Sequence, residues 1–116
     1  SKATDWFTVT QEQINQFADC TLDHQFIHTD PEAASKTTFG STIAHGFLSL
    51  SMLSHFAESF GTIIDGVYMG VNYGFDKVRF ISPVKVNSKI RATATLIKAV
   101  EKKPGPFTLT TDVTIE

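Results

Sequence analysis

The sequence contains a single cysteine, Cys20, among 116 residues. One cysteine excludes a disulfide within the chain and suits a reducing compartment, so we expect a cytoplasmic protein. Long hydrophobic runs are also missing, because the longest mainly apolar stretch, residues 43–53, is interrupted by His, Gly and Ser. Neither a signal peptide nor a membrane span is visible, and we therefore expect no membrane partner.

Positive charge is scarce at the start of the chain. Only Lys2 and Lys36 are basic before residue 70, and the other eight of the ten basic residues fall between Lys77 and Lys103. The formal net charge of −2 argues against nucleic acid as a partner. The basic stretch is either an edge that faces an anion or the solvated side of strands, and we favour the second interpretation because it is the commoner one.

The composition is that of a folded domain, with 41% hydrophobic and 19% charged residues. A chain of this length forms one domain, which we place at residues 1–116. Ten phenylalanines are many for this length, and they predict an aromatic core or an apolar pocket.

Two short helices are predicted from their capping residues. Thr10, with a glutamine three residues later, forms a capping box for a helix over residues 10–20. Asp30 followed by Pro31 is an N-cap and first-turn pair, which starts a second helix over residues 31–36.

A long helix followed by strands makes up the rest of the chain. Apolar residues cover almost every side of a helix over residues 43–60, which predicts that it is buried in the centre of the domain. Residues 67–82 read as one or two strands, and residues 85–96 alternate polar and apolar side chains as a half-buried antiparallel strand does. A turn at residues 102–106 leads into a return strand. We predict an α+β domain in which an antiparallel β-sheet wraps a long central helix.

The stretch "DHQFIHTDP" combines acids and histidines. Asp23 and His28 lie five positions apart, so they converge only if residues 24–27 form a turn, with Phe26 and Ile27 packed inward. A carboxylate and an imidazole that are shielded from bulk water can hold and activate a water molecule. The alternative is structural: Asp23 caps a turn and His28 bonds to the backbone.

A metal site is a further interpretation of the same stretch, with His24, His28, Asp30 and His45 as ligands. The segment does not read as the helix that would bring His24 and His28 to one face, and no Cys or Glu lies at a useful spacing. We therefore predict that the chain binds no metal.

The expected start of the long helix, "TIAHGF", contains His45 and Gly46. The first N–H groups of a helix lack intrahelical partners, and a glycine lets another molecule approach the backbone closely. The Gly46 N–H is thus a candidate donor to a carbonyl oxygen that gains negative charge. Alternatively, Gly46 only permits close packing, His45 caps the helix or supports the loop, and Ser54 either bonds to the helix backbone or points into a pocket.

The region "FADCTLDHQFIHTDPEAASKTTFGSTIAHGFLSLSML" resembles the MaoC-like dehydratases, the (R)-specific enoyl-CoA hydratases, and within them the branch of nodulation-protein-N-like members. The family pattern is a carboxylate, a spacer ending in an aliphatic residue, His-x-Asp, and then aliphatic-x-His-Gly. Here these are Asp23, the segment 27–30 and the segment 43–46. "GVNYGFDKVRFISPVKVNSKIRATATL" resembles the strands that follow, so the likeness covers nearly the whole chain.

The resemblance implies a hot-dog fold and reversible hydration of a trans-2-enoyl-CoA to a (3R)-3-hydroxyacyl-CoA, a hydro-lyase reaction of fatty acid metabolism. It implies catalytic roles for Asp23 and His28, substrate contacts for Gly46, Ser54 and the adjacent His45, and a homodimer. CoA enters as part of the acyl-CoA substrate, and no separate cofactor is expected.

Two features depart from the family pattern. Many members have Asn-Pro where this chain has Gln25-Phe26, which bears on the turn geometry and on the substrate. Relatives usually carry one more strand than the sequence shows, so we expect the last strand of the domain to be missing from residues 1–116.

Other functions fit a hot-dog domain as well. One is an acyl-CoA thioesterase, for which Glu58 is the one acid within the predicted long helix. Another is a non-catalytic module that binds acyl-CoA. A metal-dependent hydrolase is the last alternative. The chain length of the acyl group, and whether CoA or acyl carrier protein delivers it, cannot be deduced from these residues.

Overall fold

The computed structural model describes residues 2–60, 74–101 and 107–116. Along the described part of the chain, two short strands come first, five helices follow, and three strands come last. In chain order they are β1 (Lys2–Ala3), β2 (Phe7–Thr8), α1 (Gln11–Thr21), α2 (Phe26–Thr29), α3 (Pro31–Ser35), α4 (Gly46–Ser51), α5 (Leu53–Phe60), β3 (Lys89–Ile90), β4 (Ala92–Glu101) and β5 (Phe107–Ile115).

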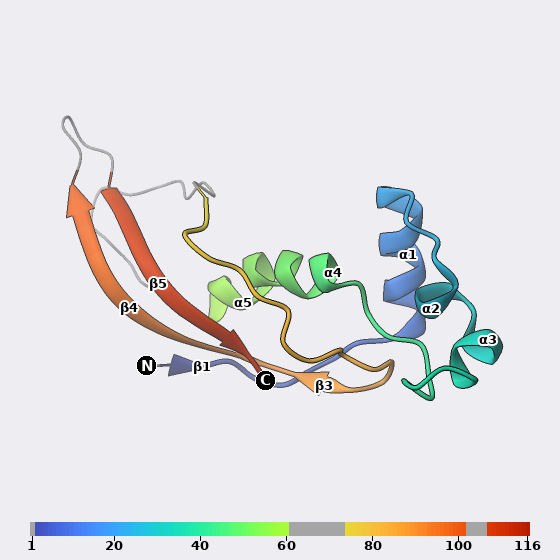
Figure 1. Cartoon of the computed structure of the whole chain (residues 1–116). Helices are drawn as coiled ribbons and strands as arrows, with labels where there is room; N and C mark the ends of the chain where they lie inside the picture. Colours follow the sequence, from blue (N-terminus) through green and yellow to red (C-terminus); the bar gives the residue numbers. More distant parts are fainter. Residues whose placement is uncertain (1, 61–73, 102–106) are drawn as a thin grey trace.

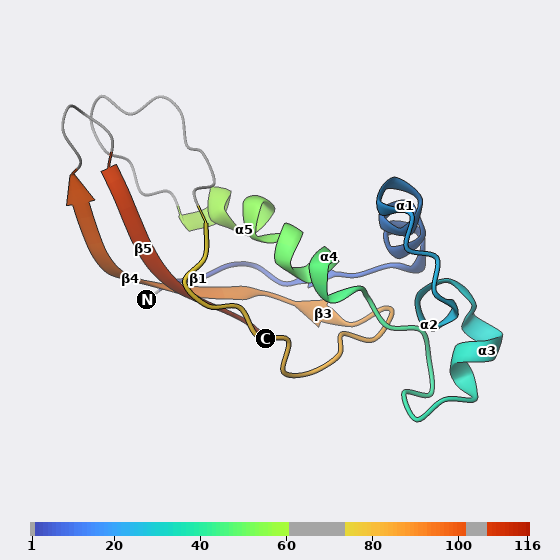
Figure 2. The ribbon, with the colours of Figure 1, turned by 45° about the horizontal axis from the view of Figure 1, so that its top comes forward.

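The strands form antiparallel sheets, and the helices lie against one side of them (Figure 1). The larger sheet has the order β1-β4-β5, and β2 pairs with β3 in a second small sheet. In both ribbon views α4 and α5 run along the strands, while α1, α2 and α3 gather at the end of the molecule away from the end of β4 and the start of β5 (Figure 2). The predicted α+β architecture is confirmed.

The two short helices form where their capping residues predict them. The Thr10 side chain accepts a hydrogen bond from the Gln13 N–H at 3.2 Å, and Leu22, with φ of 65°, ends α1. Asp30 accepts from the Ala33 N–H at 3.1 Å, with Pro31 in the first turn of α3. These side chains satisfy N–H groups that a helix leaves without partners.

The prediction of one helix over residues 43–60 is wrong at its start and in its middle. Before α4 the chain is extended, because it pairs with a distant segment: the Ala44 N–H donates to the Val84 carbonyl at 2.7 Å, and Ile43 forms a β-bridge with Lys85. The helix therefore begins at Gly46. It is interrupted again at Met52, which separates α4 from α5.

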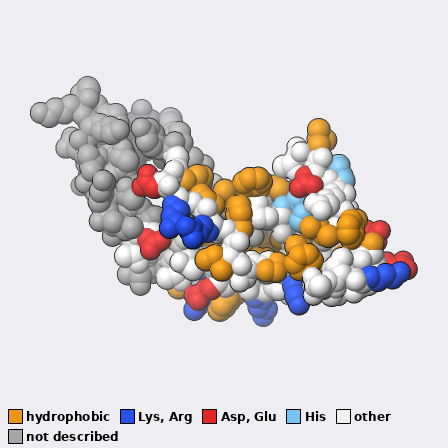
Figure 3. Space-filling model, viewed as in Figure 1, with side chains coloured by type: hydrophobic (Ala, Val, Ile, Leu, Met, Phe, Trp, Pro, Cys, Tyr) orange, Lys and Arg blue, Asp and Glu red, His pale blue; other side chains and the backbone are white. Residues whose placement is uncertain are grey.

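The central helix is also not buried on every side, as its apolar composition predicted. Leu48 and Phe56 are buried, but Phe47 is 66% exposed. The reason is that the sheet covers only one side of α4 and α5 within a single chain. Hydrophobic side chains consequently gather on the open face of the molecule (Figure 3). The large exposed ones are Trp6, Leu22, Phe26, Phe47, Phe75, Val78, Phe80 and Ile81.

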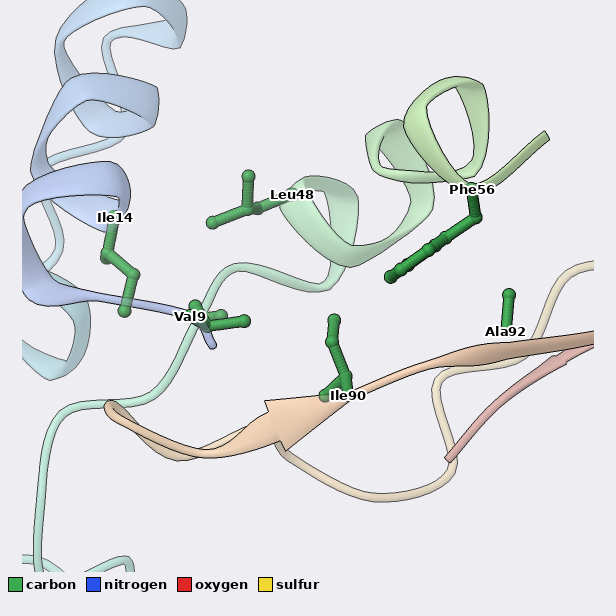
Figure 4. Packing of buried hydrophobic residues seen from close by; sticks show 7 residues of the cluster. Val9, Ile14, Leu48, Phe56, Ile90 and Ala92 are labelled. Carbon is green, nitrogen blue, oxygen red and sulfur yellow. The ribbon is translucent and has the colours of Figure 1, made fainter. Parts of the chain in front are cut away.

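The core lies between α1, the central helices and the inner face of the strands. Figure 4 shows Leu48 and Phe56 pointing from the helices toward Ile90 and Ala92 on the strands, with Val9 and Ile14 beside them. Burial alternates as predicted over residues 89–95, since Ile90, Ala92 and Ala94 are buried while Lys89 and Thr95 are exposed. The strand predicted to begin at Lys85 is wrong at its start, because residues 86–87 form a turn, with Asn87 at a φ of 65°, and β3 begins at Lys89.

The strand predicted over residues 67–82 is wrong where it can be compared. Residues 67–73 lie outside the described part of the chain, and residues 74–82 are not in a strand. Several apolar side chains of this segment, such as Phe75 and Ile81, are exposed, so the pattern that suggested a strand does not reflect burial in a sheet of this chain. The turn predicted at residues 102–106 lies outside the described residues.

The extents of the molecule are 54 × 27 × 22 Å, and its radius of gyration is 16.6 Å. A compact domain of this length has a radius of gyration of about 13 Å. The chain is therefore elongated and leaves much of its helix layer uncovered. Among the described residues, no helix combines the length and the apolar character needed to cross a lipid bilayer.

Candidate active site

Three side chains from separate elements converge beside the start of α4. Asp23 lies in the turn after α1, His28 lies on the single turn of α2, and His45 is the N-cap of α4. One nitrogen of each histidine and one carboxylate oxygen of Asp23 all lie within 4.8 Å of one another. The sequence required a turn between Asp23 and His28 for this convergence, and the chain supplies it through residues 23–25 and α2.

His28 is held in one orientation by the backbone around it. Its ring is 7% exposed, and Nδ1 lies 2.7 Å from the Ile43 carbonyl oxygen. Because a carbonyl oxygen only accepts hydrogen bonds, Nδ1 carries the proton, and in the neutral ring Nε2 is left as a free base. Gln11 donates from Nε2 to the His28 carbonyl at 2.7 Å, which ties α2 to α1.

His45 is buried more deeply, at 3% exposed. Its ring stacks on that of His28, with centroids 3.9 Å apart and planes 23° from parallel, and the Phe17 ring lies on it at 4.9 Å. Nε2 of His45 donates to the backbone carbonyl of Asp23 at 3.0 Å. The sequence suggested that His45 contacts the substrate or supports the loop. In the structure it is buried and contacts the His28 ring and the backbone of Asp23.

Asp23 carries the most exposed group of the three. Its side chain is 52% exposed, and Oδ2 lies 3.9 Å from His45 Nε2. Oδ1 accepts a long hydrogen bond of 3.4 Å from the Gln25 N–H. The carboxylate thus faces solvent while the imidazole of His28 lies behind it, an arrangement in which both groups can contact one water molecule.

Gly46 is the first residue of α4, so its N–H has no acceptor within the helix. The ring of Phe80 lies against it, since a Cβ built on Gly46 would come within 3.1 Å of that ring. A contact this short leaves room for a side chain only if Phe80 moves. Phe80 also packs edge-on against Phe47, with ring centroids 5.6 Å apart.

A cavity of about 800 Å³ opens beside His28 and Gly46. Lys77 and Arg79 lie in its wall together with Phe80, and residues 112–115 of β5 form another part of the wall. Figure 3 shows histidine side chains surrounded by hydrophobic ones on this face of the molecule. Two cations of the basic stretch therefore line a cavity, whereas the sequence favoured a solvated strand face for that stretch.

Several predicted residues lie elsewhere. Ser54 is exposed on α5 and is not among the residues that line the cavity; Ser49, one turn after Gly46, is. Phe26 is 47% exposed in this chain and does not pack inward, so the prediction is wrong for Phe26, whereas Ile27 is half-buried. No local pattern of residues distinguishes Ser49 from Ser54 as the serine that faces the cavity.

The metal ligands considered from the sequence do not form one cluster. His24 pairs with Asp19 at 2.9 Å on the surface, and Asp30 caps α3. Among the described residues, Asp23, His28 and His45 lie close enough together to hold a divalent cation, but each histidine already has one nitrogen bound to a backbone carbonyl. The arrangement can equally hold a water molecule between a base and a carboxylate.

Comparisons with known proteins agree with this arrangement of elements. The sequence pattern of the family described as "MaoC like domain" matches residues 1–115. The chain is 46% identical to 3-hydroxyacyl-thioester dehydratase Z of Mycobacterium tuberculosis over 113 residues, which cover 97% of this chain and 74% of the relative. It is 47% identical to nodulation protein N of Rhizobium leguminosarum bv. viciae over 114 residues, which cover 97% and 71%.

A solved structure, that of the (R)-hydratase from A. caviae involved in PHA biosynthesis, superimposes on this chain with a TM-score of 0.70 and 26% identity. The superposition covers 98% of this chain and 83% of the hydratase. It confirms the hot-dog fold predicted from the sequence.

Proposed function

This chain belongs to the family of MaoC-like domains, a family of dehydratases and hydratases, and we propose that it catalyses the reversible (R)-specific hydration of trans-2-enoyl-CoA to (3R)-3-hydroxyacyl-CoA. The observation that carries the proposal is that His28 and Gly46 line one cavity, while a carboxylate oxygen of Asp23 lies within 4.8 Å of a His28 nitrogen. We propose an enoyl thioester as the substrate and Asp23 and His28 as the catalytic pair. We propose the (3R) alcohol as the product.

The tautomer of His28 assigns it the role of base. With Nδ1 hydrogen-bonded to the Ile43 carbonyl, the free Nε2 accepts a proton from the water as its oxygen bonds to C3 of the enoyl group. The Asp23 carboxylate orients the same water. The addition is completed when the proton is delivered to C2 on the same face, so that H and OH are added across the double bond.

Gly46 is the proposed donor to the thioester carbonyl. As negative charge moves onto that oxygen during attack at C3, a backbone N–H without an intrahelical acceptor stabilises it. The glycine matters because a side chain here would collide with the Phe80 ring or with the substrate.

The cavity suits an acyl-CoA. Its apolar wall, which includes Phe39, Ile43 and Phe80, can contact the acyl group. Lys77 and Arg79 can pair with the phosphates of CoA. We also propose a homodimer, since the elongated shape and the exposed Phe47 and Phe80 leave an apolar face that a second copy would cover.

The direct test is to follow the absorbance of the enoyl band with crotonyl-CoA and with longer enoyl-CoA thioesters, together with chiral analysis of the product. The expected result is loss of the band and formation of the (3R) alcohol, without inhibition by a chelator. Release of free thiol with the enoyl band unchanged would make the protein a thioesterase instead. Stabilisation by acyl-CoA without any turnover would make it a binding module.

A further inference from the structure

We propose that His45 is a positioning residue for the hydration reaction: it fixes the backbone of Asp23 so that the carboxylate stays beside His28. The proposal rests on the function proposed above and concerns the same site. It differs from the substrate contact that the sequence suggested for His45, because His45 is 3% exposed and is not among the residues that line the cavity.

The hydrogen bond defines the state of the His45 ring. Nε2 lies 3.0 Å from a carbonyl oxygen, which only accepts, so Nε2 carries a proton. Nδ1 is buried and has no hydrogen-bond partner among the described residues. A second proton on Nδ1 would therefore be a buried donor without an acceptor, stacked at 3.9 Å on another imidazole. The Nε2–H of His45 is therefore aimed at the backbone of Asp23.

The segment that carries Asp23 needs such a tie. Residues 23–25 belong to no helix or strand, and they follow Leu22, whose φ of 65° turns the chain out of α1. Among the described residues, the Asp23 side chain accepts one hydrogen bond, the long one of 3.4 Å from the Gln25 N–H. The bond from His45 joins positions 22 residues apart and attaches this turn to the start of α4.

The stacked rings connect His45 to His28, the proposed base, as well. The His45 ring also meets the Phe17 ring at a tilt of 58°. One buried imidazole thus contacts the ring of His28 through its face and the backbone of Asp23 through its N–H, so loss of His45 would remove a contact from both the base and the segment that carries the acid. In catalysis, misplacement of reacting groups by about 1 Å can cost on the order of 10²-fold in rate.

Three substitutions separate the N–H donor from the bulk of the ring. His45→Gln keeps an N–H at a similar distance from the backbone as Nε2, His45→Asn places its N–H too close to the backbone to reach Asp23, and His45→Ala removes it. We expect kcat with crotonyl-CoA to fall about 10–10²-fold in His45→Ala and His45→Asn while KM changes little. In His45→Gln we expect most of the wild-type kcat.

His55→Ala provides the matched control, since His55 is an exposed histidine of α5 that packs against the Phe7 ring. Its kcat should stay within about twofold of wild type, as for other surface substitutions. Thermal unfolding of each variant shows whether it is folded. An increase in KM alone in His45→Ala would mean that His45 binds substrate, and equal losses in His45→Gln and His45→Ala at equal stability would show that the donor is not what matters. Either result overturns the proposal.

Amide hydrogen exchange at residues 23–25 tests the tie without any turnover. Faster exchange in His45→Ala, restored toward wild type in His45→Gln, is expected because the turn loses and then regains its attachment to α4. Unchanged exchange in His45→Ala would refute the proposal. This measurement keeps the two failures apart: a wild-type protein without hydratase activity disproves the proposed function, and the exchange data then judge the role of His45 by themselves.

Discussion

Replacing His28 by alanine is expected to lower kcat for hydration of crotonyl-CoA by about 10²–10⁴-fold, the usual contribution of a general acid–base group. The substitution removes the Nε2 base of a ring that lines the cavity and is held by the hydrogen bond from Nδ1 to the Ile43 carbonyl. The measurement is the initial rate at saturating substrate, with the folded state checked by circular dichroism.

The matched control for this substitution is His24→Ala. His24 lies four residues earlier in the same segment, but its ring is on the surface and pairs with Asp19. Its loss should change kcat by no more than about twofold, as for other exposed positions. Turnover close to wild type in His28→Ala, in a protein that remains folded, would remove His28 from the mechanism.

Replacing Phe56 by alanine is expected to lower the free energy of unfolding by about 3–5 kcal/mol, the typical cost of emptying a buried phenylalanine site. Phe56 is 1% exposed, points from α5 toward the strands (Figure 4), and meets the Phe7 ring edge-on at 6.5 Å. Native domains have a free energy of unfolding of only about 5–15 kcal/mol, so this substitution would remove a large part of it.

Urea denaturation at one fixed protein concentration measures this loss, with the slope of the transition reporting whether unfolding stays two-state. Phe75→Ala is the comparison, since Phe75 is 63% exposed and its removal opens no cavity in the core. A cost below about 1 kcal/mol for Phe56→Ala, similar to that of an average surface change, would contradict the assignment of Phe56 to the core.

The parts of the fold that the sequence predicts correctly depend on short-range physics. The caps at Thr10 and Asp30 need only a side-chain oxygen and an N–H three residues later. The alternation of residues 89–95 needs only that one face of a strand is buried. Such patterns are visible within a few consecutive residues, and the structure confirms them.

The parts that the sequence misses depend on partners far along the chain. The helix begins at Gly46 because the backbone at Ala44 pairs with Val84, and no local pattern shows that pairing. The sequence also does not show which side of the helix faces the cavity, where Ser49 is a lining residue and Ser54 is not. The apolar pattern of residues 74–82 suggested a strand, whereas this segment supplies part of the cavity wall.

The sequence likewise predicted only part of the candidate site. Asp23 and His28 stand out because an acid and a histidine lie near each other in sequence. The contact from His45 does not, because its acceptor is a backbone carbonyl 22 residues away, and a main-chain acceptor leaves no trace in the pattern of side chains. A buried histidine is informative only once its neighbours are known.

The central claim, that Asp23 and His28 act on one water molecule as a unit, is tested most directly by a double-mutant cycle for hydration of crotonyl-CoA. The variants are Asp23→Asn, His28→Ala and the combination of both. Residues that act as a unit give losses that do not add, so the double variant should be about as slow as His28→Ala alone. If the two losses multiply instead, or if Asp23→Asn turns over like the wild type, the two side chains do not share a water and the account is contradicted.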